Sequence, residues 1–211
     1  MTKIVFATCR AKPDLQNSDV PLAEAFGARG YAVGAAPWNG PRAPFAAAAA
    51  VLIRSTWDYQ DAPDDFSSWL ASLPEGRVFN DPALMRPNMS KRYLLDLARR
   101  GAPLPPTLYV EPDADAIAAA MDALGLETAV VKPEYGATAS GLSLVRRGDK
   151  AGLAAAAAKM AMPGLVQAPV QEISKAGETS FVFIAGGFTH AVTKRPKAGE
   201  IRCQAEYGGA A

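Results

Sequence analysis

Strand-forming runs alternate with amphipathic segments over the first 87 residues. Runs rich in β-branched and aromatic residues predict buried strands, and they cover residues 3–8, 31–38, 51–55 and 77–82. Apolar residues at helical spacing predict two helices among these strands, at residues 19–30 and 61–74. Such alternation gives a parallel sheet with helices on both faces. We therefore expect a Rossmann-like α/β domain over residues 1–87.

The two predicted helices carry start and stop signals. Asp19 is a candidate N-cap of the first helix, and Gly30 is a candidate C-terminal stop. The apolar face of the second helix comprises Phe66, Trp69, Leu70 and Leu73. This face is expected to pack against the sheet.

The remaining residues predict a second group of short elements. Ser90 can cap a helix that Gly101 ends, and helices are also expected at residues 112–125 and 149–160. Strands are expected on both sides of the loop after Lys132, in a run broken by Pro169, and in a hairpin turning at Gly186-Gly187. Three aromatic residues of the hairpin are expected in the core, namely Phe181, Phe183 and Phe188.

Charge and composition narrow the class of protein. The formal net charge is +1 and 49% of residues are hydrophobic, so no bulk field draws in nucleic acid or an anionic membrane. The most apolar run, residues 45–53, is far shorter than the roughly 20 residues that span a bilayer. Cys9 and Cys203 are the only cysteines, which argues against a disulfide framework. We expect a cytoplasmic protein without nucleic-acid or membrane partners.

The stretch VVKPEYGATASGLSLV, residues 130–145, suggests an anion site. It places Lys132 at a strand end, and an ammonium group there suits phosphate oxygens. Gly136, Ser140 and Gly141 keep the following loop thin, so its backbone N–H groups could approach an anion. The alternative is a plain hairpin with a solvated lysine. The spacing matches neither the P-loop nor G-x-G-x-x-G, which also disfavours a Rossmann-type oxidoreductase.

Residues further along the chain favour the anion site. Pro169 interrupts a β-like run and frees backbone donors and acceptors that a purine edge could use. Glu178 could accept a hydrogen bond from a ribose hydroxyl, and Lys194 and Arg202 add positive charge nearby in the sequence. The order and residue types together indicate a nucleotide site.

This order of motifs resembles the ATP-grasp superfamily, in its glutathione-synthetase-like branch. The matching segments are NMSKRYLL, PLPPT, VVKP, LVQAPVQEI, GETSFVF and TKRPKAGEIRCQAEYGG. VLIRSTWDY and QAEYGG are most similar to a narrower group that contains the cyclo-ligase acting on O-ureido-D-serine in D-cycloserine biosynthesis. The resemblance implies a small ATP-grasp subdomain over residues 88–166 and the first part of a second one over residues 167–211. The ATP-grasp fold would then be incomplete.

The resemblance also implies roles for individual residues. The nucleotide would be bound by Lys91, Lys132, Gly136, Ser140, Gly141, Gln167, Ala168, Val170 and Glu178. Lys194 and Arg202 would be catalytic, facing the γ-phosphate and an acyl-phosphate. Arg54 and Ser55 would bind the substrate. Lys91 could instead be a helix-surface lysine, and Arg54 could form a structural ion pair within the first domain.

The implied reaction is that of an ATP-dependent carboxylate–amine ligase or cyclo-ligase working through an acyl-phosphate. ATP and Mg²⁺ would be the cofactors, and the other partner a small amino-acid-like substrate. The metal ligands of the family lie after the last segment of this chain, so no metal site is expected within it and the chain is expected to be an inactive truncated piece. A non-catalytic nucleotide-binding or interaction protein is the alternative. The branch also implies a homodimer as one oligomeric state.

Overall fold

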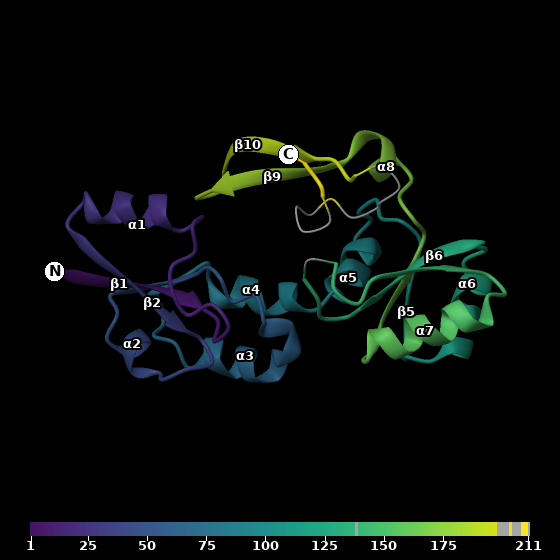
Figure 1. Ribbon diagram of the computed structural model, residues 1–211, viewed down its shortest axis with the longest axis horizontal. Helices are drawn as coiled ribbons and strands as arrows, with labels where there is room; N and C mark the ends of the chain where they lie inside the picture. The colour runs from purple at the N-terminus through teal and green to yellow at the C-terminus, as the bar shows by residue number, and fades with distance from the viewer. Residues whose placement is uncertain (138, 198–202, 204–207, 211) are drawn as a thin grey trace. The chain divides into compact units, whose positions relative to one another are not determined.

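A computed structural model describes residues 1–137, 139–197, 203 and 208–210 of the chain. The chain divides into two units, Met1–Tyr93 and Leu94–Ala211, and each is described by itself (Figure 1). The finer division of the second part at residue 166 stays a prediction.

The first unit is built on a parallel sheet with the strand order β2-β1-β3-β4. The strands are β1 (Thr2–Thr8), β2 (Tyr31–Pro37), β3 (Ala50–Ile53) and β4 (Val78–Phe79). β1 is central, and its last five residues are buried, as expected for a parallel strand covered on both faces. The predicted Rossmann-like class is confirmed.

Helices of the first unit bury aromatic residues beside this sheet. They are α1 (Val20–Gly27), α2 (Ala43–Ala46), α3 (Pro63–Ala71) and α4 (Pro82–Met89). Phe66, Trp69 and Leu70 of α3 are buried as predicted, and Trp69 meets Phe45 of α2 edge to face at a centroid distance of 5.1 Å. The sequence pattern missed α4, which begins at a cap on Asp81 and contains a proline.

The second unit contains a four-stranded antiparallel sheet with the order β5-β8-β6-β7. Its strands are β5 (Thr107–Val110), β6 (Thr128–Pro133), β7 (Ser143–Arg146) and β8 (Gly164–Gln167). The helices α6 (Ala114–Ala123) and α7 (Lys150–Met160) lie on one side of this sheet (Figure 1). Their apolar residues form a core with every second residue of β6, including Ala129 and Val131. The opposite face of the sheet is not covered by these helices.

Short helices and a hairpin complete the second unit. The helices are α5 (Tyr93–Arg99), whose first residue lies in the first unit, and α8 (Glu172–Ala176), which the sequence pattern missed. Ser90 caps the turn before α5, because its hydroxyl accepts a hydrogen bond from the Arg92 backbone N–H at 3.2 Å. Gly101 has a positive φ of 85°, as predicted for the stop after α5.

The hairpin consists of β9 (Glu178–Ile184) and β10 (Gly187–Lys194). Its two turn residues are Ala185 and Gly186, both at positive φ, which is the two-residue turn that matches strand twist. The predicted turn at Gly186-Gly187 is therefore wrong by one residue. The predicted core placement of the three phenylalanines is also wrong. The residues are 56–65% exposed, and they are Phe181, Phe183 and Phe188. In the described residues they contact one another rather than a second layer.

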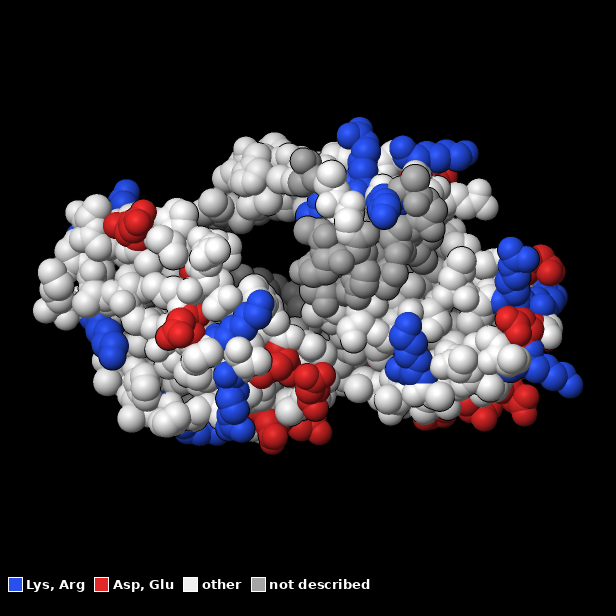
Figure 2. Space-filling model, in the orientation of Figure 1, with Lys and Arg blue, Asp and Glu red and all other residues white. Residues whose placement is uncertain are grey.

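Acidic and basic side chains are interspersed on the face of each unit that Figure 2 shows. No helix among the described residues is long and apolar enough to cross a membrane. On the face that Figure 2 shows, neither the acidic nor the basic side chains form a broad patch. An anion would therefore have to be bound there by local groups.

Candidate functional site

The uncovered face of the antiparallel sheet forms the floor of a cavity of about 560 Å³. Side chains alternate between the two faces of a strand, so Thr128, Val130 and Lys132 of β6 line the cavity while their neighbours enter the core. Leu144 of β7 and Gln167 of β8 line the same face. On this face of the sheet the cavity therefore combines apolar side chains with the ammonium group of Lys132.

Lys132 is the first donor in a series of three hydrogen bonds. Its Nζ donates to Gln167 Oε1 at 2.9 Å, and Gln167 Nε2 donates to Thr107 Oγ1 at 2.8 Å. Thr107 Oγ1 in turn donates to the Pro105 carbonyl at 2.7 Å. Because a lysine can only donate, this chain fixes the orientation of the Gln167 amide. Burial lowers the pKa of Lys132 below its ordinary value.

The segment after β8 presents two backbone groups at the cavity wall. The Ala168 N–H donates to the Pro106 carbonyl at 2.9 Å, so it is not available to a ligand. Pro106 has no N–H to donate to the Ala168 carbonyl in return, and no other described residue donates to this carbonyl through its backbone. Among the described residues, the Val170 N–H also has no hydrogen-bond partner. A free acceptor and a free donor thus lie two residues apart, on residues that line the cavity.

The far side of the cavity includes the start of β9. Glu178 lines the cavity, and its Oε1 lies 3.9 Å from Lys194 Nζ of β10. Both side chains are about 40% exposed or more, so this pair is screened by solvent. Cys203 also lines the cavity, and burial raises the pKa of its thiol.

The small-residue loop contributes less than its sequence suggests. Ala139 and Leu142 line the cavity, but the described lining does not include Gly136, Ser140 or Gly141. The backbone N–H of Ser140 donates within the loop, to Ala137 at 2.9 Å. Gly141 is required sterically, because its φ is +72° and a Cβ there would lie 2.8 Å from Pro133 Cγ. A phosphate-binding role for this loop stays a prediction.

The two predicted substrate residues meet a buried carboxylate in the first unit. Arg54 Nε donates to Asp19 Oδ1 at 2.7 Å, and Ser55 Oγ donates to Asp19 Oδ2 at 2.9 Å. Asp19 is 1% exposed. It occupies the predicted N-cap position of α1, but its side chain makes no capping hydrogen bond there. Arg54 therefore forms the structural ion pair, and neither of its Nη atoms has a partner within the described part of the chain.

The roles of two other predicted site residues stay predictions. Lys91 lies in the first unit, between α4 and α5, and Arg202 lies outside the described residues. A search of the described residues finds no group of three or more metal-binding side chains.

Sequence reasoning missed several residues of the cavity. The alternation of β6 around Lys132 could have identified Thr128 and Val130. The supporting contacts of Pro106 and Thr107 with β8 could not be predicted from local sequence. They depend on the pairing of strands that are about 60 residues apart. The sequence pattern did not predict α8, so the residues of this helix that line the cavity were missed as well, among them Ile173 and Lys175.

Part of the chain matches a known protein family, and most of it matches a curated relative. Residues 4–80 match the family described as the N-terminal domain of D-cycloserine synthetase DcsG. The cycloserine biosynthesis protein DcsG of Streptomyces lavendulae is 29% identical over 182 residues, covering 82% of this chain and 61% of that protein. The chain thus spans about three fifths of the length of this relative.

Solved structures give the same result for the fold. The crystal structure of DcsG matches with a TM-score of 0.77 at 25% identity, covering 92% of this chain and 68% of DcsG. A RimK-domain ATP-grasp protein from Sphaerobacter thermophilus matches with a TM-score of 0.60 at 25% identity, over 79% of this chain and 64% of that one. A D-alanine–D-alanine ligase from Bacillus anthracis shares the fold at 15% identity, with a TM-score of 0.64 over 92% of this chain and 65% of that one. The resemblance indicated by the sequence motifs is therefore confirmed: the chain is similar to D-cycloserine synthetase DcsG, and its fold is similar to that of ATP-grasp proteins.

Proposed function

We propose that the chain is the nucleotide-binding part of an ATP-dependent ligase that joins a carboxylate to an amine or closes a ring. The observation that carries the proposal is the cavity of the second unit. It combines a lysine ammonium group, an apolar middle and a free backbone donor–acceptor pair. Five residues predicted to bind nucleotide line it, namely Lys132, Gln167, Ala168, Val170 and Glu178.

The backbone pair suits adenine. The amino group of adenine would donate to the Ala168 carbonyl, and a ring nitrogen would accept from the Val170 N–H. Guanine presents an acceptor and a donor in the reverse order on the same edge, so it would meet like groups. Val130 and Leu144 would pack on the faces of the purine. The site is therefore expected to prefer ATP to GTP.

The polar groups of the cavity suit the rest of the nucleotide. Lys132 would bind phosphate oxygens, since a desolvated ammonium group has a strong local interaction with an anion. Glu178 would accept from the ribose hydroxyls. Lys194 and Arg202 would stabilise negative charge on the γ-phosphate and the acyl-phosphate. Mg²⁺ supplies further charge neutralisation in phosphoryl transfer, but the described residues offer no ligand cluster for it.

A small amino-acid-like molecule is the proposed substrate, and a homodimer the proposed oligomer. Arg54 would contribute to substrate binding through the guanidinium nitrogens that Asp19 leaves free. A carboxylate must be activated because its oxygen is a poor leaving group, and phosphorylation by ATP converts it into a good one. The amine or a ring nitrogen would then attack the acyl carbon and release phosphate.

A non-catalytic nucleotide-binding protein is the second candidate. It rests on the same cavity, whose lysine and backbone groups can bind a nucleotide whether or not a reaction follows. This candidate shares the nucleotide site with the first and differs from it only in turnover.

Calorimetric titration of the chain with ATP and with GTP, each with Mg²⁺, tests the nucleotide site. We expect saturable ATP binding, GTP binding at least tenfold weaker, and loss of the preference in Val170→Pro, which lacks the N–H donor. Pro is compatible with an irregular segment, and Val170→Ala, which keeps the backbone N–H at the same position, is the matched control. Equal affinity for the two nucleotides would contradict the assignment of the adenine edge.

Measurement of ADP release then separates the two candidates. Turnover that depends on an added amino-acid-like substrate, such as O-ureido-D-serine, supports the ligase. Tight ATP binding without ADP release in the presence of a broad substrate panel supports the non-catalytic protein.

A further inference from the structure

Thr107 of β5 holds one end of the Gln167 side chain from outside the nucleotide cavity. The two residues are directly opposite each other in the antiparallel pair of β5 and β8, so their side chains share one face of the sheet. Gln167 is among the residues that line the cavity, whereas the described lining does not include Thr107. Thr107 is therefore placed to influence a ligand only through the Gln167 amide.

The hydroxyl group of Thr107 can only accept a hydrogen bond from Gln167. Its single proton goes to the Pro105 carbonyl at 2.7 Å, and this carbonyl has no other donor among the described residues. If the Gln167 oxygen faced Thr107, the hydroxyl proton would have to leave Pro105 and a backbone acceptor would lose its partner. Gln167 Nε2 therefore faces Thr107, at 2.8 Å, and Oε1 is directed away from it.

The Gln167 Oε1 atom can accept one more hydrogen bond than it receives. It accepts from Lys132 Nζ at 2.9 Å, and Lys132 is its only donor in the part of the chain that the structure describes. An amide oxygen has two lone pairs. Both side chains line the cavity, so the second lone pair is available to a donor on a ligand there.

Lys132 and Thr107 both favour this orientation of the amide, but a ligand would affect them differently. In the proposed function the Lys132 ammonium group binds phosphate, so phosphate oxygens compete with Gln167 for its protons. The hydrogen bonds of Thr107 involve only Gln167 and Pro105, and neither Thr107 nor Pro105 is in the described lining of the cavity. Thr107 therefore keeps the amide in place while Lys132 is engaged by a phosphate group.

The fixed amide oxygen distinguishes the two purines. The amino group of adenine carries two protons, and the proposed function uses one of them at the Ala168 carbonyl. The second proton matches the acceptor that Gln167 Oε1 provides. Guanine has a carbonyl oxygen in place of this amino group, and that oxygen would face two acceptors. A flipped Gln167 amide would instead present its N–H groups and favour guanine.

We propose that Thr107 is a positioning residue that sets the preference of the site for adenine. It does so by keeping Gln167 Oε1, rather than Nε2, directed into the cavity. This inference rests on the proposed nucleotide site and goes beyond it, because it assigns part of the selectivity to a residue that does not touch the nucleotide.

A nucleotide that lacks the amino group separates positioning from a general structural effect. Thr107→Val keeps the β-branched shape and removes the hydroxyl group, so ATP affinity should fall by about threefold to tenfold in calorimetric titrations. Affinity for purine riboside triphosphate, which has no amino group, should change by less than about twofold. Thr107→Ser should restore the affinity of the parent for ATP. The matched control is Thr189→Val, which removes a hydroxyl that donates to the Val182 carbonyl at 3.0 Å in the hairpin, and it should bind both nucleotides like the parent.

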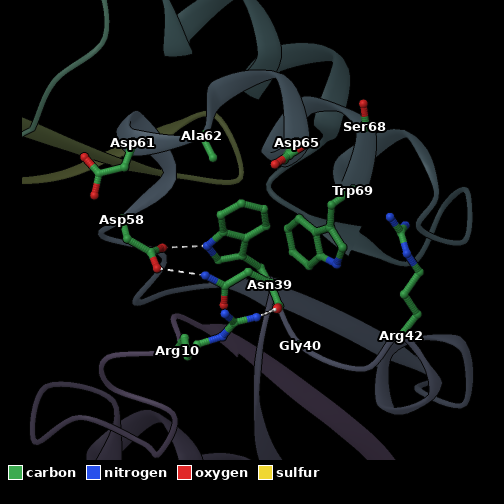
Figure 3. Close-up of a pocket in the computed structure, with 11 residues that line it drawn as sticks. Arg10, Asn39, Gly40, Arg42, Asp58, Asp61, Ala62, Asp65, Ser68 and Trp69 are labelled. Carbon is green, nitrogen blue, oxygen red and sulfur yellow. Dashed lines mark hydrogen bonds between the residues drawn. The ribbon is translucent and has the colours of Figure 1, made fainter. Parts of the chain in front are cut away.

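The orientation of the amide can also be measured without nucleotide, by NMR of the full chain. The side-chain amide signals of Gln167 are assigned by their loss in Gln167→Leu. Their exchange with water should be at least about threefold faster in Thr107→Val than in the parent or in Thr107→Ser, because the Nε2 group loses its acceptor. The Asn39 amide is an internal reference in the first unit. It donates to Asp58 Oδ2 at 3.0 Å (Figure 3), and its exchange should be the same in all variants.

Two results would overturn the proposal. One is an equal loss of affinity for ATP and purine riboside triphosphate in Thr107→Val, which would indicate a structural role only. The other is Gln167 amide exchange that does not change in that variant. Failure of the parent to bind ATP would refute the proposed function and the adenine preference with it. Gln167 exchange that still depends on Thr107 would then locate the error in the nucleotide assignment and not in the positioning of the amide.

Discussion

At the scale of single residues, the burial of Lys132 has a cost in stability. Its ammonium group is partly buried and donates to one side-chain acceptor, Gln167, among the described residues. Burial without full pairing destabilises the charged form, which is why its pKa is lowered. The same poor solvation strengthens the attraction for a phosphate group.

Substitution of this lysine is the first prediction. Lys132→Met keeps the length of the side chain and removes the charge, so ATP affinity should fall by about tenfold to a hundredfold. Lys150→Met, at an exposed position of α7, is the control and should bind ATP like the parent. Calorimetric titration measures both. An unchanged affinity in Lys132→Met would remove this residue from the site.

The lowered pKa of Lys132 makes a pH prediction. Between its folded pKa and the unfolded value, the unfolded chain binds more protons at this residue, so its contribution to the free energy of unfolding rises with pH in that window. ATP affinity should change in the opposite sense and fall as the ammonium group loses its proton, below the pH at which an ordinary lysine titrates. The phosphates of ATP are already ionised there. Lys132→Met should lack this dependence, and a parallel decline in that variant would assign it to another group.

Asp19 gives a second residue-scale prediction, because it is almost fully buried with two partners. Asp19→Asn should lower the free energy of unfolding by about 2–3 kcal/mol, less than for a fully buried pair because Arg54 is partly exposed. Asp14→Asn, at an exposed position of the same loop, should stay within about 0.5 kcal/mol of the parent. Urea unfolding curves measure the difference. Equal stability of the two variants would show that the Asp19 contacts contribute little.

At the scale of elements, glycines decide how closely the strands and loops of the second unit approach. Gly141 and Gly125 both have positive φ, +72° and +66°. A Cβ at Gly141 would lie 2.8 Å from the Pro133 ring, whereas a Cβ at Gly125 would meet nothing within 4 Å. A substitution at Gly125 therefore measures backbone strain alone, whereas one at Gly141 measures backbone strain together with steric overlap.

Alanine at these two positions is the element-scale prediction. Gly125→Ala should cost about 1 kcal/mol from the left-handed backbone alone. Gly141→Ala should cost at least 1 kcal/mol more, because the Pro133 ring is rigid and must shift. Thermal or urea unfolding measures both. Equal costs would mean that the loop after β6 moves freely away from Pro133.

At the scale of the whole molecule, the effect of a bound nucleotide on stability can be measured in each of the two units by itself. A nucleotide that binds the cavity of the second unit should stabilise that unit by mass action, by about 2.7 kcal/mol at a hundred times the dissociation constant. Hydrogen exchange should therefore slow in β6 and β8 on addition of ATP and stay unchanged in β1 and β2. Uniform protection of both units would contradict a site confined to the second.

The sequence by itself determined the alternation of strands and helices, the α/β class and the family resemblance. These features depend on local periodicity, capping and motif order, which neighbouring residues specify together. The predictions from the sequence were wrong or incomplete at positions where the local pattern of residues gives no information. A proline hid α4, the five-residue helix α8 was too short for a periodic signal, and the hairpin phenylalanines have a core composition but no described layer against them.

Only the tertiary structure decided which side chains share a site. Strand pairing brought Thr107, Lys132 and Gln167 into one hydrogen-bond chain, although up to 60 positions separate them. It also set Ala168 opposite a proline, which has no N–H to donate to the Ala168 carbonyl. It directed the side chain of Asp19, the N-cap residue of α1, to Arg54. Such partnerships depend on contacts across the chain, and the energy of a contact is not encoded in either residue alone.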